Sequence, residues 1–313
     1  MIRMFLTHIE TERRYSPLTV RNYRHDIELF DAWRREQVEK RIAEAEANGK
    51  SCSDKPEIQY TTPDDIRAWI VARSEEDKLS PASINRELSS LRSLFRFLRE
   101  RGVVEQDVFV HIGRLKKPRR LPSVIPESRI PEVLESTAER SVSQEFEQVR
   151  DALIVLMFYK CGVRLAELVG LNVEDVSAAR DSLKVLGKGD KERIIPIVGS
   201  VRSVLNNYFD VIKRQKICNS QEKALFLTTK GCRISRTKVY RTVRSMLSEA
   251  GIQGKKSPHV LRHTFATQLM NAGADMRDIQ ELMGHSSLKS TQVYTHNSIG
   301  QLQRVYAKSH PRD

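Results

Sequence analysis

The sequence has no long hydrophobic run. Its longest uninterrupted apolar stretch, from Ala152 to Tyr159, has eight residues and is bounded by Asp151 and Lys160. A helix that crosses a bilayer needs about 20 apolar residues, and the first residues lack the apolar core of a signal peptide. We therefore expect no membrane span and no secreted product, and we expect the protein in the cytoplasm.

Cysteine is also scarce. The four cysteines are scattered and form no C-x-x-C pair: Cys52, Cys161, Cys218 and Cys232. This spacing supports neither a structural zinc site nor a disulfide framework, and it suits a reducing compartment. The Walker loop G-x-x-x-x-G-K-[ST] is missing as well, which argues against nucleotide binding. Nor does the sequence contain a carboxylate cluster for two metal ions, so we expect no metal.

Positive charge is plentiful. Lys and Arg number 53 against 40 Asp and Glu, which gives a formal net charge of +13 and a pI near 9.7. Such a surplus predicts a polyanionic partner. Five basic residues fall within seven positions and are candidates for phosphate contacts: Arg114, Lys116, Lys117, Arg119 and Arg120. A run of this kind is more often a solvated linker than a binding element, so it serves as supporting evidence.

Residues 1–112 read as a helical domain. Ser16-Pro17, Thr62-Pro63 and Ser80-Pro81 each pair an N-cap residue with proline at the first helical position. Apolar residues follow at three- and four-residue steps, which indicates one buried stripe for each helix. The polar stretch 36–57 is interpreted as a helix end and a loop.

Residues 113–126 are basic and rich in proline, which is typical of an inter-domain linker, and a second domain is expected over 127–313. An apolar helix is predicted over 149–160. Two β-prone runs around the turn Gly187-Lys188-Gly189 predict a hairpin within 182–198. The expected fold is thus mainly α, with a small β-hairpin in the second domain.

The segment Ser257-Pro258-His259-Val260-Leu261-Arg262 is the most informative. Ser257 is interpreted as an N-cap, so His259 and Arg262 share a face of the first helical turns. A helix N-terminus with these side chains could bind a phosphate or a sulfate. For H-x-x-R alone, two polar residues that face water are the better interpretation.

Three further elements do not indicate a function when each is considered alone. Arg164 precedes Glu167 by three positions, and the pair alone would be a weak surface ion pair. Lys188 stands at the expected hairpin tip. His285 follows Gly284, which we expect to end a helix, and Tyr294 comes nine residues later; alone it would be a packing residue.

Together these side chains suit one reaction. Phosphoryl transfer needs charge stabilisation on the non-bridging oxygens, a nucleophile, and a proton for the leaving oxygen. Two arginines can hold a phosphodiester through paired hydrogen bonds. A tyrosine hydroxyl can attack once a neighbouring base or the bound phosphate assists its deprotonation, and a lysine can protonate the leaving group.

Six residues stand in this order along the chain: Arg164, Lys188, His259, Arg262, His285 and Tyr294. Their flanks CGVRLAELVGL, GKGDKERIIPI and PHVLRHTFATQLMNAGADMRDIQELMGHSSLKSTQVYTH resemble those of the tyrosine recombinases, the phage integrase family. The resemblance spans the whole chain and implies a helical SAM-like core-binding domain before a mixed catalytic domain. The compact length is similar to that of the Xer branch, although residues 36–57 exceed a minimal Xer amino-terminal domain.

The resemblance also implies a role for each residue. Tyr294 would attack the scissile phosphate and form a 3′-phosphotyrosyl link, and Lys188 would protonate the 5′ oxygen. Arg164, supported by Glu167, would bind the non-bridging oxygens together with Arg262. His259 would assist proton transfer to or from Tyr294, and His285 would hydrogen-bond the phosphate. Neither a cofactor nor a metal is implied.

The implied partners are duplex DNA with a palindromic core site and three further protomers, identical or paralogous, in a tetramer on two sites. The resemblance favours resolution of chromosome dimers at a dif-like site, possible activation by a septal DNA translocase, and a place with the nucleoid. An integrase or excisionase of a mobile element is the main alternative. A type IB topoisomerase, or a DNA-binding regulator without chemistry, fits less well because no catalytic position is lost.

Overall fold

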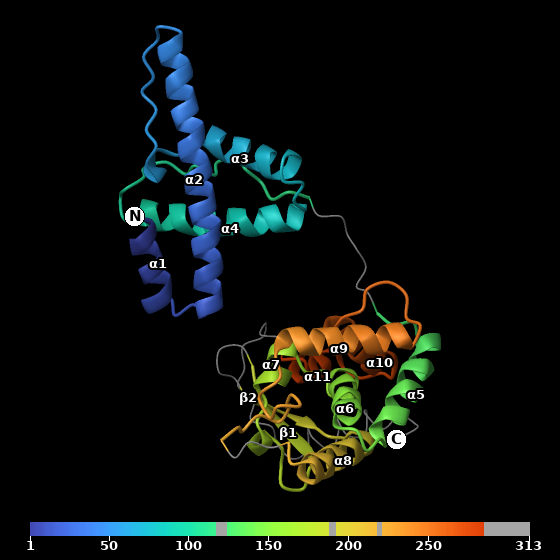
Figure 1. Ribbon diagram of the computed structural model, residues 1–313. Coiled ribbons are helices and arrows are strands. Elements are labelled where there is room, and N and C mark those ends of the chain that lie inside the picture. Colours follow the sequence, from blue (N-terminus) through green and yellow to red (C-terminus); the bar gives the residue numbers. More distant parts are fainter. Residues whose placement is uncertain (117–123, 188–191, 218–220, 285–313) are drawn as a thin grey trace. The chain divides into compact units, whose positions relative to one another are not determined.

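The computed structural model describes residues 1–116, 124–187, 192–217 and 221–284 (Figure 1). The chain divides into two compact units, an N-terminal unit of residues 1–120 and a C-terminal unit of residues 121–313. Each unit has its own hydrophobic core. The described residues are mainly helical with one two-stranded sheet, which confirms the predicted fold class.

The elements of the N-terminal unit are α1 (Ile2–Thr11), α2 (Pro17–Ala47), the short 3-10 helix η1 (Ile58–Tyr60), α3 (Pro63–Glu75) and α4 (Pro81–Glu100). The first half of the C-terminal unit contains η2 (Glu127–Arg129), α5 (Ile130–Ser141), α6 (Phe146–Lys160), α7 (Leu165–Gly170) and η3 (Val173–Asp175). The second half contains β1 (Ser182–Leu186), β2 (Glu192–Pro196), α8 (Gly199–Gln215), α9 (Arg236–Glu249), α10 (Pro258–Asn271) and α11 (Met276–Leu282).

The helices of the N-terminal unit begin where their capping residues predict. The side chains of Ser16, Thr62 and Ser80 each accept a hydrogen bond from the backbone N–H three residues on. Thr62 and Asp65 form a reciprocal capping box, which satisfies two donors of the first turn of α3. The helix starts are therefore encoded locally.

The expectation of a helix end followed by a loop over residues 36–57 is confirmed. Helix α2 continues to Ala47 and ends only at Asn48-Gly49, where Gly49 has a φ of +64°. Residues 36–47 consist largely of good helix formers, and Lys40 forms an ion pair with Glu36 over 2.6 Å. The end of α2 and the chain that returns from it project beyond the other helices of the N-terminal unit (Figure 1).

A buried arginine fixes the base of this projection. Arg34 is 2% exposed and donates to Asp65 over 3.1 Å. Its remaining bonds go to four carbonyls of the returning chain: those of Lys55, Pro56, Glu57 and Tyr60. These bonds fix the base of the projection to the rest of the N-terminal unit.

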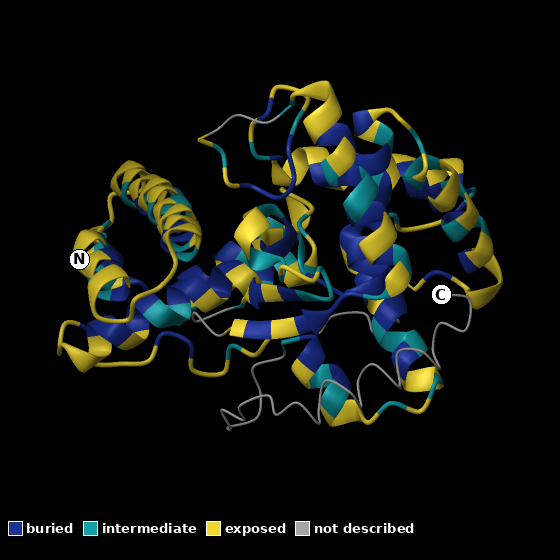
Figure 2. Ribbon diagram, turned by 90° about the horizontal axis from the view of Figure 1, so that it is seen from below, coloured by how far each residue is buried: buried dark blue, intermediate teal, exposed yellow. Residues whose placement is uncertain are grey.

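The core of the C-terminal unit surrounds α6, which packs against α5, α8, α9 and α10. Buried and exposed residues alternate along the helices, so these helices have a buried face and an exposed face (Figure 2). Strands β1 and β2 pair antiparallel, with Leu183 opposite Ile195 and Val185 opposite Arg193. The predicted helix over 149–160 and the predicted hairpin are both confirmed.

Residues at both ends of the expected linker, 113–126, are bonded to the unit next to them. The Leu115 N–H donates to the Asn85 side chain, whose amide in turn donates to the Leu115 carbonyl. Ile125 is 4% exposed, and its N–H donates to the Thr264 hydroxyl. No helix within the described residues is long and apolar enough to cross a membrane.

Candidate active site

The structure describes four of the seven residues predicted at the site: Arg164, Glu167, His259 and Arg262. Lys188, His285 and Tyr294 lie outside the described residues. The four described residues come from the start of α7 and the start of α10. What joins these two helix starts is a set of arginine side chains around one carboxylate.

Arg164 and Glu167 are held together by the first turn of α7. The Arg164 backbone N–H donates to Glu167 Oε2 over 2.7 Å, and the Arg164 guanidinium donates to Oε1 over 2.7 Å. The side chain of Glu167 is 5% exposed, whereas that of Arg164 is 32% exposed. The pair is therefore a buried carboxylate that orients a partly accessible cation, unlike the weak surface pair that the sequence alone suggested.

Arg193 completes this cluster, and the sequence analysis missed it. It lies on β2 and donates from both terminal nitrogens to the two carboxylate oxygens of Glu167, each over 2.8 Å. The signal was the alternation of β2: Glu192 and Ile194 are exposed, whereas Arg193 and Ile195 are buried. Because strand side chains alternate between two faces, Arg193 had to share the inner face with Ile195.

Arg262 is buried one turn into α10, at 5% exposure. Its guanidinium donates to the carbonyls of Gly162 and Met283 and lies 4.0 Å from Glu167 Oε2. Gly162 has a φ of +58°, and a Cβ there would lie 2.4 Å from the Phe265 ring. The close approach of this loop to α10 therefore requires glycine, and it brings a carbonyl to Arg262.

The three arginines meet the C-terminal end of α11 at successive carbonyls. Arg193 Nε donates to Leu282 over 2.9 Å, and Arg262 donates to Met283. Arg164 donates to Gly284 over 2.6 Å. The C-terminal end of a helix carries partial negative charge, so cations stabilise it there. Gly284 has a φ of +61° and ends the helix as predicted.

Charge at this cluster is unbalanced. Within the described ranges, Glu167 is the carboxylate that pairs with these arginines, so three cations face one anion. Burial raises the pKa of Glu167, but the hydrogen bonds and charges of Arg193 and Arg164 outweigh it and lower the pKa to about 2. Burial, together with the charge of Arg164, lowers the pKa of Arg262 to about 9. Glu167 and Arg262 are thus both ionised at pH 7, and the three arginines against one carboxylate give a surplus of two formal positive charges.

His259 lies in the first turn of α10 and is exposed. Partial burial, with the nearby charges of His263 and Arg262, lowers its pKa, so its imidazole is neutral at pH 7 and can accept a proton. Ser257 occupies the N-cap position, as predicted. Its hydroxyl forms no capping bond to the helix, so proline at the first position defines this helix start.

The remaining predicted residues are those of the basic run, 114–120, which belongs to the N-terminal unit. Arg114 and Lys116 of the basic run are exposed, whereas Lys117, Arg119 and Arg120 are not described. Over the described parts of the chain, no group of three or more His, Cys, Asp or Glu side chains is arranged to hold a metal ion.

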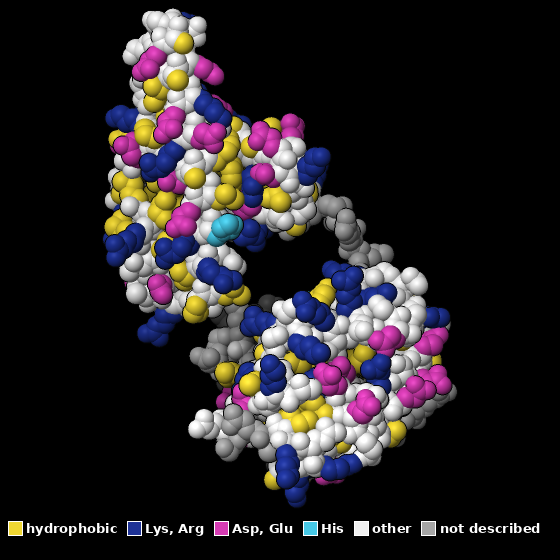
Figure 3. All heavy atoms as spheres, in the orientation of Figure 1, with side chains coloured by type: hydrophobic (Ala, Val, Ile, Leu, Met, Phe, Trp, Pro, Cys, Tyr) yellow, Lys and Arg dark blue, Asp and Glu magenta, His cyan; other side chains and the backbone are white. Residues whose placement is uncertain are grey.

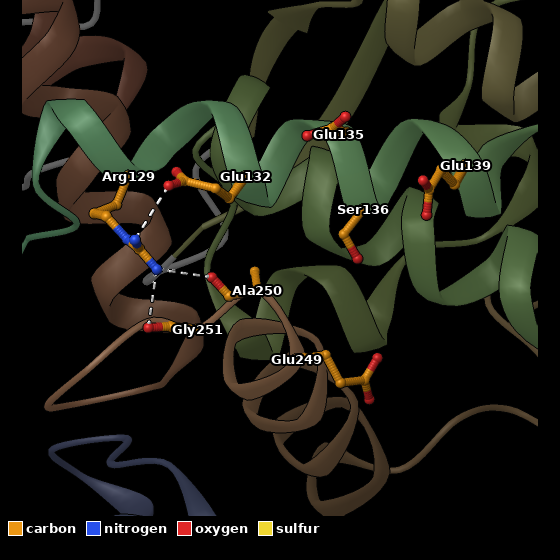
Figure 4. Close-up of a pocket in the computed structure, with 8 residues that line it drawn as sticks. All are labelled: Arg129, Glu132, Glu135, Ser136, Glu139, Glu249, Ala250 and Gly251. Atoms are coloured by element: carbon orange, nitrogen blue, oxygen red, sulfur yellow. Dashed lines mark hydrogen bonds and ion pairs between the residues drawn. The ribbon is translucent and has the colours of Figure 1, made fainter.

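A pocket of 390 Å³ lies between α5 and the end of α9 (Figure 4). Its lining includes Glu132, Glu135, Glu139 and Glu249, and Arg129 bridges it from Glu132 to the carbonyl of Gly251. A pocket lined by four carboxylates would repel a phosphate. The arginine cluster, rather than this pocket, has the chemistry of an anion site.

The exposed side of α9 carries a second concentration of positive charge. Four of its basic residues are exposed: Arg236, Lys238, Arg241 and Arg244. Basic side chains gather on this part of the C-terminal unit (Figure 3). The sequence has no acidic residue from Ser235 to Ser248. Such a face suits a polyanion.

Comparison with known proteins identifies both units. The sequence model of the Phage integrase family matches residues 124–300. That of the Phage integrase N-terminal SAM-like domain matches residues 2–50 and 50–102.

Curated relatives match over the full length. The chain is 32% identical to the tyrosine recombinase XerD of Lacticaseibacillus casei, covering 100% of this chain and 99% of the relative. It is 34% identical to the tyrosine recombinase XerC of Thermodesulfovibrio yellowstonii, with 99% and 96% covered. Among solved structures, XerH recombinase bound to a palindromic difH substrate shares the fold. The TM-score is 0.68 and the identity 20%, over 98% of this chain and 84% of that one.

Proposed function

The chain belongs to the phage integrase family and is a site-specific tyrosine recombinase that cuts and rejoins DNA; we propose that it resolves chromosome dimers at a palindromic, dif-like site. Full-length similarity to XerC and XerD relatives supports this role. It would act in the cytoplasm, on the nucleoid, during chromosome partition and cell division.

The observation that carries the chemistry is the pair Arg164 and Arg262 beside Glu167. A phosphodiester carries one negative charge, and a second develops as the nucleophile adds to phosphorus. Two arginines that one carboxylate does not neutralise match that charge. We therefore assign them to the non-bridging oxygens, where their preorganised donors stabilise the transition state.

The other roles follow the order of the motifs. Tyr294 attacks phosphorus, its proton is lost, and the 5′ oxygen leaves with a proton from Lys188 while the 3′ phosphate stays on Tyr294. His259 has the lowered pKa of a base that accepts a proton at neutral pH. His285 hydrogen-bonds the phosphate. Because the covalent link retains the phosphodiester bond energy, the reaction needs no nucleotide cofactor.

The exposed basic face of α9 is proposed to lie against the DNA backbone, with Arg114 and Lys116 of the linker run as further phosphate contacts. Phosphate contacts of this kind govern affinity and its salt dependence, but they carry no base information. The active assembly would be a tetramer of this protein, alone or with a paralogue, on two sites. A septal DNA translocase is a candidate activator.

One observation favours the second candidate, a recombinase of a mobile element. Helix α2 extends to Ala47, and the SAM-like domain matches in two stretches that meet at residue 50. The two matches meet within residues 36–57, the stretch that the resemblance marks as longer than a minimal Xer amino-terminal domain. Synteny and a palindromic site beside the gene would separate the two roles.

The chemistry is tested with a suicide substrate. Wild-type protein and Tyr294→Phe are incubated in EDTA with nicked duplexes that carry the candidate site, and the products are separated on a denaturing gel. A covalent protein–DNA band from the wild type alone supports tyrosyl chemistry without a metal. A band from Tyr294→Phe, or none from a wild type that binds the site, would overturn the assignment.

A further inference from the structure

We infer that Arg193 is a positioning residue of the cleavage site, which holds Glu167 so that Arg164 is presented to the scissile phosphate. The inference rests on the proposed role of Arg164. It concerns a residue that touches neither the phosphate nor the nucleophile in that proposal.

The first step of the argument is the saturation of Glu167. Its Oε1 accepts from the Arg164 and Arg193 guanidinium groups over 2.7 and 2.8 Å. Its Oε2 accepts from the Arg164 backbone N–H and from Arg193 over 2.7 and 2.8 Å. Arg193 supplies half of these bonds. Without it, each oxygen of this buried carboxylate keeps a single donor, both of them from Arg164, and the bonds that hold the carboxylate from β2 are lost.

The second step is the anchoring of Arg193 itself. Its Nε donates to the Leu282 carbonyl, and the residue is 6% exposed. A Cβ on Gly284 would lie 3.1 Å from an Arg193 terminal nitrogen. The guanidinium is therefore fixed between the end of α11 and Glu167. A planar guanidinium with donors on two edges can bond to both of these partners at once, whereas the ammonium group of lysine lacks that geometry.

The third step is electrostatic. Arg193 and Glu167 neutralise each other through a two-bonded ion pair, which leaves the charges of Arg164 and Arg262 for the phosphate. Loss of Arg193 would leave Glu167 to take its compensation from those two arginines. The site would then keep its DNA affinity, which many phosphate contacts supply, but would lose transition-state stabilisation.

The test measures the first-order cleavage rate constant on saturating suicide substrate and, separately, the Kd for DNA. Arg193→Gln is expected to lower the rate constant about tenfold or more, because small displacements of a catalytic group cost that much, with Kd nearly unchanged. Arg193→Lys should fall between the two. In a Glu167→Gln background, Arg193→Gln should lose far less, because both changes remove the same support.

Arg150 provides the matched control. It is also a buried arginine of the C-terminal unit, 1% exposed, and it pairs with Glu147 and Asp151 on α6. Arg150→Gln should lower thermal stability without lowering the cleavage rate constant of the folded protein.

The pH profile adds a readout that loss of stability would not produce. The charged groups that face Glu167 are Arg164 ahead of α7, Arg193 on β2 and Arg262 on α10. In Arg193→Gln, the pKa of Glu167 should rise, so the ratio of variant to wild-type rate should fall further as the pH falls from 7 to 5. The comparison therefore covers a window of roughly 2 pH units.

Each outcome has one meaning. A slower Arg193→Gln with a normal Arg150→Gln and a pH-dependent ratio supports the inference. Rate constants within about twofold of wild type for both Arg193 variants would overturn it, as would an equal loss in Arg150→Gln. A wild type that forms no Tyr294-dependent adduct would instead overturn the proposed function, and this inference with it.

Discussion

Each unit of the molecule buries an arginine cluster, and the two differ in their charge balance. In the N-terminal unit, Arg34 and Arg41 share Asp65, and Asp54 pairs with Arg41. The rest of Arg34 is bonded to four backbone carbonyls. In the C-terminal unit, three arginines share Glu167.

The difference separates a structural cluster from the proposed binding site. Two cations against two carboxylates leave no charge to satisfy, and such a cluster fixes chain segments in place. Three cations against one carboxylate hold a surplus whose desolvation costs stability, and that surplus is ready for an anionic ligand. The shared carboxylate is buried in both clusters, Asp65 at 2% and Glu167 at 5% exposure, so charge balance is the better indicator of function.

Removing the surplus should have the largest effect. Arg262→Gln is expected to lower the cleavage rate constant by about 10⁴-fold, or ~5 kcal/mol of transition-state stabilisation, as for other arginines that bind a transferring phosphoryl group. Its thermal stability should match or exceed that of the wild type, because a desolvated, under-compensated cation is lost. Single-turnover cleavage and calorimetry check both. A marked loss of stability would show that Arg262 is structural.

Breaking the balanced cluster should have the opposite effect, a loss of stability rather than of cleavage rate. Arg34→Gln leaves Asp65 buried without its Arg34 partner and removes a donor from four carbonyls, and it should destabilise the N-terminal unit by about 4 kcal/mol. The chain's two tryptophans, Trp33 and Trp69, both belong to this unit, so tryptophan fluorescence reports its unfolding alone.

Arg41→Gln is the control for this experiment. The Arg41 side chain is 44% exposed, and an exposed ion pair contributes at most about 1 kcal/mol. If Arg41→Gln cost as much as Arg34→Gln, the four carbonyl contacts would not account for the stability of the cluster.

Acid should weaken the C-terminal unit by a smaller amount. The pKa of Glu167 lies near 2 in the folded chain, against an ordinary value of 4.5. A lowered pKa contributes stability that is present in full above pH 4.5 and is lost as the pH falls toward 2. The loss should total about 3 kcal/mol. Denaturant unfolding by circular dichroism from pH 5 downward measures it, and Glu167→Gln should abolish this part of the acid sensitivity.

Much of the fold is predictable because its signals are local. The caps at Ser16, Thr62 and Ser80 and the hairpin around residue 187 depend on neighbouring residues. The end of α2 at Asn48-Gly49 is local too, because residues 36–47 are largely good helix formers and the breakers follow them directly.

The candidate site was only partly predictable. Motif order selected Arg164, Glu167, His259 and Arg262, and the structure brings Arg164, Glu167 and Arg262 together. Arg193 was missed because its partners lie 26 and 89 residues away in the chain. The roles of Lys188, His285 and Tyr294 stay predictions.

The three carbonyls at the end of α11 have a consequence for mutational tolerance. Every residue type offers the same backbone oxygen, so substitution of Leu282 or Met283 leaves the acceptor for each arginine in place. Leu282 and Met283 are both buried in the hydrophobic core, so apolar replacements that preserve this packing should leave the site unchanged. The acceptors depend on the path of the main chain, to which the left-handed conformation of Gly284 contributes. An amide-to-ester replacement, which weakens a single carbonyl acceptor, would make these contacts visible to experiment.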